Sequence, residues 1–302
     1  MPVVAVDCGG TNLSVARLER ATDPVEPVVV ATPSEAGDIP VAITELAGEL
    51  GGGESIGVAI AGLVDAGNLV WMPHRDGGAE IARPLSAALG ARVEVDNDAN
   101  CACLAEATVG AGAGHRMVLT VTVGTGIGGG LVIDGRIERG RGFLGEIGHT
   151  SLEIEGPMCS CGKRGCWEAF ASGSAMDRAA AEVAGAEPEG HVAAAAGASQ
   201  PSGSHLVAAV RAGDRSAARA FGEIAMHFGR GLANMVVVFD PDVIVVGGGA
   251  GSIGELLLEP ARREMVSRVA GAGHRRPTPV VSAALGPNAG LVGAALLAGA
   301  PA

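Results

Sequence analysis

The chain has 302 residues, of which 48% are hydrophobic and 18% charged, so it can bury a sizeable core and exceeds one typical domain in length. Its formal net charge of -12 at pH 7 disfavours binding to nucleic acid and to anionic membrane surfaces. The amino terminus lacks a basic segment, and the apolar stretches end well before the roughly 20 residues of a membrane helix, so we expect a cytoplasmic protein.

Short apolar runs alternate with helical periodicity in the first part of the chain. Val3 to Val6 is typical of a strand that ends at Asp7, and Gly9 and Gly10 would turn the chain into a second strand ending at Leu18. Helices are predicted at residues 39–50, 81–89 and 101–109, and strands at residues 55–60, 93–95 and 117–123. Because strands alternate with helices, we expect a mainly parallel α/β sheet.

The second part of the chain is richer in helical periodicity. Helices are predicted at residues 217–238, 253–269 and 288–300, with a buried strand at 243–246. Pro260 should interrupt the second of these helices. Residues 183–204 are rich in alanine, glycine, proline and serine without clear periodicity, which predicts a mobile surface loop.

Two lobes are expected from the length of the chain and from the recurrence of strand, glycine-rich turn and helix in both parts. The boundary is placed near residue 97. The smaller α/β lobe would comprise residues 1–97 with the last helix, 288–302. The larger α/β lobe would comprise residues 98–287.

The segment Asp7-x-Gly9-Gly10-Thr11-Asn12 places a carboxylate at a strand end beside two glycines and a hydroxyl. Glycines let backbone N–H groups approach a phosphate, and the carboxylate suits a metal ion bound to that phosphate. An ordinary glycine hairpin would have the same appearance. The segment therefore indicates either a nucleotide phosphate site or a tight turn.

A second glycine-rich segment, Gly124–Gly130, contains the pattern G-x-G-x-x-G of dinucleotide-binding proteins. That pattern requires the glycines to open a helix. Here residues 131–137 are typical of a strand and a hairpin, so NAD binding is disfavoured. A second phosphate-binding turn is the interpretation that remains.

Three consecutive glycines, Gly247, Gly248 and Gly249, lie between the strand at 243–246 and the helix that follows. A turn without side chains can pack its backbone against a flat ligand such as adenine or ribose. The same glycines would suit a turn selected only for tight packing, and the residues themselves do not separate the two explanations.

Four potential metal ligands cluster in one segment: His149, Cys159, Cys161 and Cys166. Three thiolates and an imidazole match the ligand types and number of a closed tetrahedral zinc site. Because four protein ligands leave no position for water or substrate, the zinc is expected to be structural. Unmetallated thiols in a loop are the alternative. The other cysteines, Cys8, Cys101 and Cys103, are interpreted as small core residues.

The segment from Asn97 to Asn100 lies between a predicted strand and a predicted helix. Asparagine and aspartate at a helix start commonly cap its free N–H groups. An aspartate in a cleft would instead suit the removal of a proton from an attacking hydroxyl. The sequence leaves both roles open for Asp98.

Together, six motifs resemble those of the ROK family of sugar kinases and related repressors, and in particular its bacterial glucokinases. They are DCGGTN at 7–12, DNDAN at 96–100, TVGTGIGGG at 122–130, GEIGH at 145–149, CSCGKRGCWE at 159–168 and FDPDVIVVGGG at 239–249. The resemblance spans essentially the whole chain. It implies a two-lobed actin-like ATPase (ribonuclease H-like) fold, ATP and magnesium as cofactors, structural zinc, and a homodimer formed through the larger lobe.

The resemblance implies ATP-dependent phosphorylation of a hexose, with Asp98 as the general base that accepts the proton of a sugar hydroxyl, usually at C6. His149 would bind zinc through one nitrogen and sugar through the other, and Asp7 would lie near the magnesium ion. The resemblance also implies contacts with the sugar from Gly62, Asn97, Glu146 and Glu168. It implies contacts with the nucleotide phosphates from Gly9, Gly10, Thr11, Asn12, Thr125 and Gly126. It implies contacts with adenosine from Gly247, Gly248 and Gly249.

One segment departs from the family pattern. Glucokinases of this family usually carry a Pro-Asn pair followed by a tryptophan near the sugar, where this chain has Pro73 followed by His74, Arg75 and Asp76. An added imidazole or carboxylate near the sugar would favour an amino sugar such as kanosamine, glucosamine, N-acetylglucosamine or N-acetylmannosamine. A solvated loop with unchanged preference for glucose is the alternative.

Two classes of protein without kinase activity are disfavoured. ROK repressors carry a winged helix-turn-helix ahead of the sugar-binding fold, and the first motif at Asp7 leaves no room for one. A sugar-responsive regulator without catalysis is disfavoured because both Asp7 and Asp98 are retained. The small-molecule partners expected are therefore a sugar and ATP, without nucleic acid or membrane.

Overall fold

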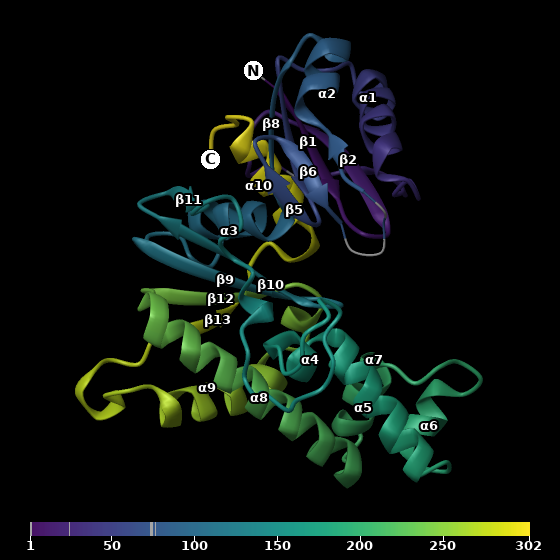
Figure 1. Cartoon of the computed structure of the whole chain (residues 1–302), viewed down its shortest axis with the longest axis vertical. Coiled ribbons are helices and arrows are strands. Elements are labelled where there is room, and N and C mark those ends of the chain that lie inside the picture. Colours follow the sequence, from purple (N-terminus) through teal and green to yellow (C-terminus); the bar gives the residue numbers. More distant parts are fainter. Residues whose placement is uncertain (1, 24, 73–74, 76) are drawn as a thin grey trace. The chain divides into compact units, whose positions relative to one another are not determined.

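The computed structural model of the chain describes residues 2–23, 25–72, 75 and 77–302 (Figure 1). The chain divides into two compact units. Unit 1 comprises Met1–Thr120, Gly129–Gly145 and Ala283–Ala302, and unit 2 comprises Val121–Gly128 and Glu146–Ser282. The division into lobes at residue 97 stays a prediction.

A five-stranded sheet of order β3-β2-β1-β4-β8 forms the centre of unit 1. Its strands are β1 (Val3–Cys8), β2 (Asn12–Leu18), β3 (Val28–Ala31), β4 (Ser55–Ile60) and β8 (Arg92–Asn97). The predicted turn after β1 is confirmed, because β1 pairs antiparallel with β2. β1 also pairs parallel with β4, and β4 pairs parallel with β8, as expected for strands joined through helices.

The helices of unit 1 are α1 (Ile39–Glu49), α2 (Ala82–Leu89), α3 (Asp98–Val109) and α10 (Ala289–Leu297). Alternate residues of β1 face two different cores, as the period of a strand requires. Val4 packs in one core with Ile43 of α1, whereas Ala5 packs in the other with Ala294 of α10. A Cβ at Gly57 of β4 would lie 1.8 Å from the Ala294 oxygen, so this glycine allows α10 to approach the sheet.

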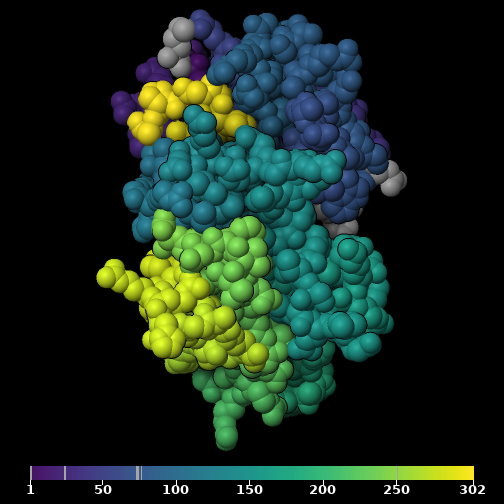
Figure 2. Space-filling model, turned by 60° about the vertical axis from the view of Figure 1, so that its left-hand side comes forward, coloured from purple at the N-terminus to yellow at the C-terminus, as the bar shows by residue number. Residues whose placement is uncertain are grey.

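The last residues of the chain therefore belong to the same unit as the first. Figure 2 shows the yellow C-terminal residues beside the purple and blue N-terminal residues. A smaller sheet in this unit has the order β5-β6-β7. Its strands are β5 (Leu63–Asp65), β6 (Asn68–Trp71) and β7 (Ala79–Glu80).

A second five-stranded sheet has the order β11-β10-β9-β12-β13. Its strands are β9 (Met117–Val123), β10 (Ile127–Ile133), β11 (Arg136–Glu138), β12 (Val243–Gly247) and β13 (Val280–Ser282). β10 and β11 form the predicted antiparallel hairpin. The glycines that precede them therefore lead into a strand and not into the helix that a dinucleotide-binding turn requires.

Helices dominate unit 2. They are α4 (Trp167–Ala171), α5 (Gly173–Ala186), α6 (His191–Ala196), α7 (Gly203–Arg211), α8 (Arg215–Phe239) and α9 (Glu255–Arg268). The long helix α8 packs against α4, α5, α7 and α9. Trp167 of α4 stacks on Phe228 of α8 with ring centroids 5.5 Å apart, and both side chains are fully buried.

Short 3-10 segments connect several of these elements. They are η1 (Ala36–Asp38), η2 (Ile147–His149), η3 (Gly249–Ile253), η4 (Ala272–His274) and η5 (Gly286–Asn288). Among the helices of the described residues, none is long and apolar enough to cross a bilayer.

Two expectations about the helices of unit 2 are wrong. The stretch 183–204, expected to be a loop, contains α6, because Val192 and Ala196 four residues apart form a buried face. Helix α9 continues through Pro260 without interruption. Leu257 and Ala261 on either side of the proline are buried, so tertiary packing offsets the hydrogen bond that proline cannot donate.

Candidate active site and metal centre

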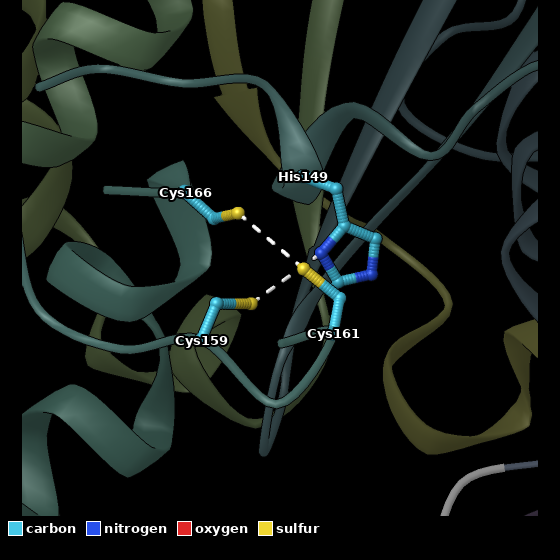
Figure 3. Close-up of side chains that lie close together, drawn as sticks. All are labelled: His149, Cys159, Cys161 and Cys166. Atoms are coloured by element: carbon cyan, nitrogen blue, oxygen red, sulfur yellow. Dashed lines mark hydrogen bonds between the residues drawn. The ribbon is translucent and has the colours of Figure 1, made fainter. Parts of the chain in front are cut away.

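The four predicted metal ligands lie together in unit 2 (Figure 3). His149 ends η2, Cys166 immediately precedes α4, and Cys159 and Cys161 lie in the connecting loop. Their potential ligand atoms all lie within 4.8 Å of one another. Cys159 Sγ is 3.6 Å from His149 Nδ1, and Cys161 Sγ is 3.6 Å from Cys166 Sγ. The predicted clustering is confirmed.

The donor set fits a tetrahedral zinc ion. With Zn–S of about 2.3 Å and Zn–N of about 2.0 Å, the edges of a tetrahedral site measure roughly 3.8 Å between sulfurs and roughly 3.5 Å between sulfur and nitrogen. The two 3.6 Å separations are close to these edges. Burial raises the pKa of the Cys159 thiol, and a bound divalent cation would act in the opposite direction by stabilising the thiolate.

The two ring nitrogens of His149 face different partners. Nδ1 faces Cys159, on the side of the potential metal site. Nε2 lies 3.7 Å from Glu146 Oε2, so it points toward a carboxylate outside the cluster. An imidazole that holds a metal with Nδ1 is left with an N–H at Nε2, which is fixed in direction and can donate to an oxygen.

Glu168, the second residue of α4, connects the cysteine loop with the glycine-rich turn after β9. Its Oε1 accepts hydrogen bonds from Cys159 Sγ and Ser160 Oγ, each at 3.0 Å. Its Oε2 accepts a bond from the Ile127 backbone N–H at 3.3 Å. A Cβ at Gly126 would lie 2.4 Å from Glu168 Oε2, so the glycine leaves room for this carboxylate where it lies. No sequence signal singled out Ser160.

The turn that carries Thr125 and Gly126 is anchored by its carbonyl groups. Gly173 N–H at the start of α5 donates to the Gly124 oxygen at 2.8 Å, and Ser174 Oγ donates to the Thr125 oxygen at 2.8 Å. Thr125 is exposed. The anchoring places an exposed hydroxyl at a turn whose backbone is fixed, which suits a contact with phosphate.

Asn97 and Asp98 lie in unit 1, where β8 ends and α3 begins. Asn97 caps the helix, because its Oδ1 accepts from Ala99 N at 2.8 Å and from Asn100 N at 3.2 Å. Its Nδ2 donates to the Gly62 oxygen at 3.0 Å. The capping interpretation is therefore confirmed for Asn97, and Gly62 is brought beside it.

The Asp98 carboxylate is held by the helix start. Its Oδ1 accepts a hydrogen bond from Ala99 N at 2.9 Å. Burial raises the pKa of Asp98, and the hydrogen bonds from the Ala99 and Asp98 backbones and from the Asn97 side chain act against that effect without reversing it. A raised pKa is typical of a carboxylate that accepts protons during catalysis.

Asp7 lies near the end of β1, against the first turn of α10. A Cβ at Gly290 would lie 2.4 Å from Asp7 Oδ2, so that glycine accommodates the carboxylate. Burial and, after it, the negative charge of Asp98 raise the pKa of Asp7 to about 7. A carboxylate whose proton affinity is raised by burial and by the negative charge of a second carboxylate would attract a divalent cation with oxygen ligands, such as magnesium.

The turn after Asp7 is closed by backbone hydrogen bonds. Gly9 N–H donates to the Asn12 oxygen at 2.9 Å, and Thr32 Oγ1 donates to the Gly9 oxygen at 2.8 Å. Gly10, Thr11 and Asn12 are exposed. The hairpin explanation is thus correct for the backbone, and the exposed positions remain candidates for phosphate contacts.

The glycines after β12 give a similar result. Gly248 has φ of 77°, and a Cβ there would lie 2.6 Å from the Val123 oxygen, so tight packing alone requires glycine at this position. Gly247 is buried at the end of β12, whereas Gly249 begins η3 and is exposed. A contact with adenosine stays a prediction for these three residues.

Of the segment that departs from the family pattern, Pro73, His74 and Asp76 lie outside the described residues. The neighbouring Arg75 donates from Nε to the Pro33 oxygen at 2.9 Å and from Nη2 to the Gly10 oxygen at 3.0 Å. Its guanidinium group therefore contacts the backbone of the glycine turn after β1.

Asp7 leads to a prediction about stability. Since its pKa is near 4 in the unfolded chain and about 7 in the folded protein, the folded state holds a proton between these values and stability falls as pH rises through this window. The free energy of unfolding of Asp7→Asn should therefore exceed that of the wild type by about 2–4 kcal/mol at pH 8. This difference should disappear toward pH 4.

Urea denaturation from pH 4 to pH 8, without magnesium or nucleotide, measures this difference. The exposed Asp134, replaced by asparagine, serves as the control and should follow the wild type. Parallel pH dependences for the wild type and Asp7→Asn would contradict the proposed cause.

Comparison with solved structures identifies the fold. A ROK family glucokinase from Streptomyces griseus, in complex with glucose and AMPPNP, matches with a TM-score of 0.88 and 36% identity over 99% of both chains. A ROK hexokinase from Thermus thermophilus matches with a TM-score of 0.79 and 37% identity over 99% of this chain and 98% of that one. The protein has the actin-like ATPase fold of this class of sugar kinases.

Sequence comparison leads to the same class. Glucokinase from Streptomyces coelicolor is 37% identical over 309 residues, which cover 99% of this chain and 98% of that protein. The ROK family model matches residues 3–300. The chain belongs to the ROK family, and the resemblance drawn from its six motifs is confirmed.

Proposed function

We propose that the protein is an ATP-dependent hexose kinase that phosphorylates the 6-hydroxyl of glucose or of a closely similar sugar. The glucokinases similar to it over nearly its whole length support this function. The observation that carries the proposal is the placement of Asp98, a carboxylate of raised pKa, at the capped start of α3.

Asp98 is the proposed general base. As the sugar oxygen forms its bond with the γ-phosphorus of ATP, the bond from that phosphorus to the leaving ADP oxygen breaks, and Asp98 takes the proton of the hydroxyl. Little covalent work is required of the protein, so alignment of the hydroxyl and stabilisation of charge supply most of the acceleration. The hydrogen bond from Ala99 N fixes the position of the carboxylate.

The other proposed sugar contacts come from Gly62, Asn97, Glu146, His149 and Glu168. His149 would donate from Nε2, because Nδ1 faces the metal ligands. We infer that zinc is held by His149 and the three loop cysteines and that its role is structural. The metal would fix the His149 ring and the loop that orients Glu168.

The nucleotide phosphates would lie against the glycine turns, with contacts from Gly9, Gly10, Thr11, Asn12, Thr125 and Gly126, and adenosine against Gly247, Gly248 and Gly249. Asp7 would hold magnesium, which would neutralise phosphate charge when bound. A homodimer in the cytoplasm is part of the same proposal.

The test is a coupled ADP-release assay with magnesium-ATP and a panel of glucose, glucosamine, kanosamine, N-acetylglucosamine, N-acetylmannosamine, mannose and fructose. We expect turnover to be dominated by glucose and to yield a product that glucose-6-phosphate dehydrogenase oxidises. A preference for an amino sugar would support the alternative suggested by the Pro73–Asp76 segment. A folded, metal-replete protein that phosphorylates none of these sugars, with either ATP or polyphosphate as donor, would contradict the proposal.

A further inference from the structure

Asp96, the residue before the cap of α3, is buried in unit 1 with 4% of its surface exposed. Its Oδ1 accepts from the Asn97 backbone N–H and from Asn100 Nδ2, each at 2.8 Å. A single carboxylate oxygen thus binds the residues on both sides of Asp98. These bonds hold the chain at the point where β8 becomes α3, next to Asp98.

Arg139 neutralises this buried carboxylate. It follows β11 and donates to Asp96 Oδ2 from Nε at 2.7 Å and from Nη2 at 2.6 Å. Both distances are at the short end for charge-assisted hydrogen bonds. Asp96 therefore has donors on both oxygens, two from the chain around Asp98 and two from one guanidinium group.

We propose that Arg139 is a positioning residue for the phosphoryl transfer, acting through Asp96 on the helix start that holds Asp98. The inference rests on the proposed function, since it concerns the same base. Without Arg139, a buried charge would lack its partner, and Asp96 would move toward water. This movement weakens the bonds to Asn97 and Asn100 and displaces Asp98 from the reacting hydroxyl.

The expected signature is a loss of kcat without a loss of nucleotide binding. A misplacement of about 1 Å at the reacting group can lower a rate by as much as 100-fold. Arg139→Gln should therefore reduce kcat about 10- to 100-fold, with the KM for ATP within about twofold of wild type. Arg139→Lys restores the charge without the planar fork and should recover part of kcat.

Two comparisons separate this role from a general structural one. Arg136→Gln removes an exposed arginine of the same hairpin and should leave kcat unchanged. Asp96→Asn should lower kcat in the same manner as Arg139→Gln, and the double variant should lose less than the product of the two single losses, because both act through one contact. Thermal melting of each variant reports whether it is folded.

Steady-state kinetics of these variants with the best sugar of the panel is the deciding experiment. A folded Arg139→Gln variant with wild-type kcat, or multiplicative losses in the double variant, would overturn the inference and leave the proposed function intact. If Arg139→Gln does not fold, Arg139→Lys decides, and wild-type kcat in that variant would equally overturn it. Absence of turnover by the wild-type protein would overturn both the function and this inference.

Discussion

Replacing Asp98 with asparagine is expected to lower kcat on glucose by about 100- to 10,000-fold, the range that a general base contributes. Asparagine has nearly the same shape and retains an oxygen that can accept the hydrogen bond from Ala99 N, but it cannot take up the proton of the sugar hydroxyl. The KM for ATP should change little. The variant should not melt at a lower temperature, because burial disfavours the charge that the substitution removes.

The pH profile gives a second measure of the same residue. A general base acts only when it is deprotonated. Because the pKa of Asp98 is raised, the acidic limb of kcat/KM should lie at a higher pH than an ordinary aspartate would give if Asp98 is the base. Asp134→Asn, an exposed substitution of the same kind, serves as the control. Retention of more than a third of wild-type kcat in Asp98→Asn would remove Asp98 from the role of base.

Loss of the proposed zinc ion should have the second largest effect. Cys161 is the exposed member of the four ligands, so Cys161→Ser removes one ligand without opening a cavity in the core. We expect the variant to contain little zinc and to be less stable by about 3 kcal/mol or more, which corresponds to a fall in Tm of roughly 6–12 °C. The KM for glucose should rise about 10- to 100-fold, because His149 and Glu168 would lose their orientation. Replacing residues that orient metal ligands typically has an effect of this size on activity.

Elemental analysis, thermal melting and sugar kinetics test this prediction together. The matched control is the wild type stripped by a chelator and then supplied with zinc again, which should recover both Tm and the KM for glucose, whereas Cys161→Ser should not. A folded Cys161→Ser protein with a full zinc content would contradict the four-ligand site.

The motifs and the regular elements were predictable because they depend on local patterns. The apolar run Val3–Val6 predicted β1, and the spacing of His149 with the three cysteines predicted a cluster that the fold brings together. Helix α6 was missed because its short buried face, Val192 and Ala196, is hidden in an alanine-rich stretch where periodicity is hard to detect. The strand β3 was missed as well, since all four of its residues are exposed.

The contacts that support the candidate residues could not be predicted, because each joins positions far apart in the sequence. Arg139 and Asp96 are 43 residues apart, and Ile127 and Glu168 are 41 residues apart. Nothing in the local composition of either partner indicates the other. Such pairs follow from the sheet topology, which a single sequence specifies only indirectly.

The position of α10 has a consequence for biosynthesis. The face of β1 and β4 that contains Ala5 and Ala59 is covered by residues 289–297. That face can therefore be buried only after almost 300 residues have been synthesised. Until then, an apolar surface of the first-made strands is open to chaperones or to other nascent chains. Contacts between such distant positions also raise the contact order, which predicts that unit 1 folds slowly and completes its core only at the end of synthesis.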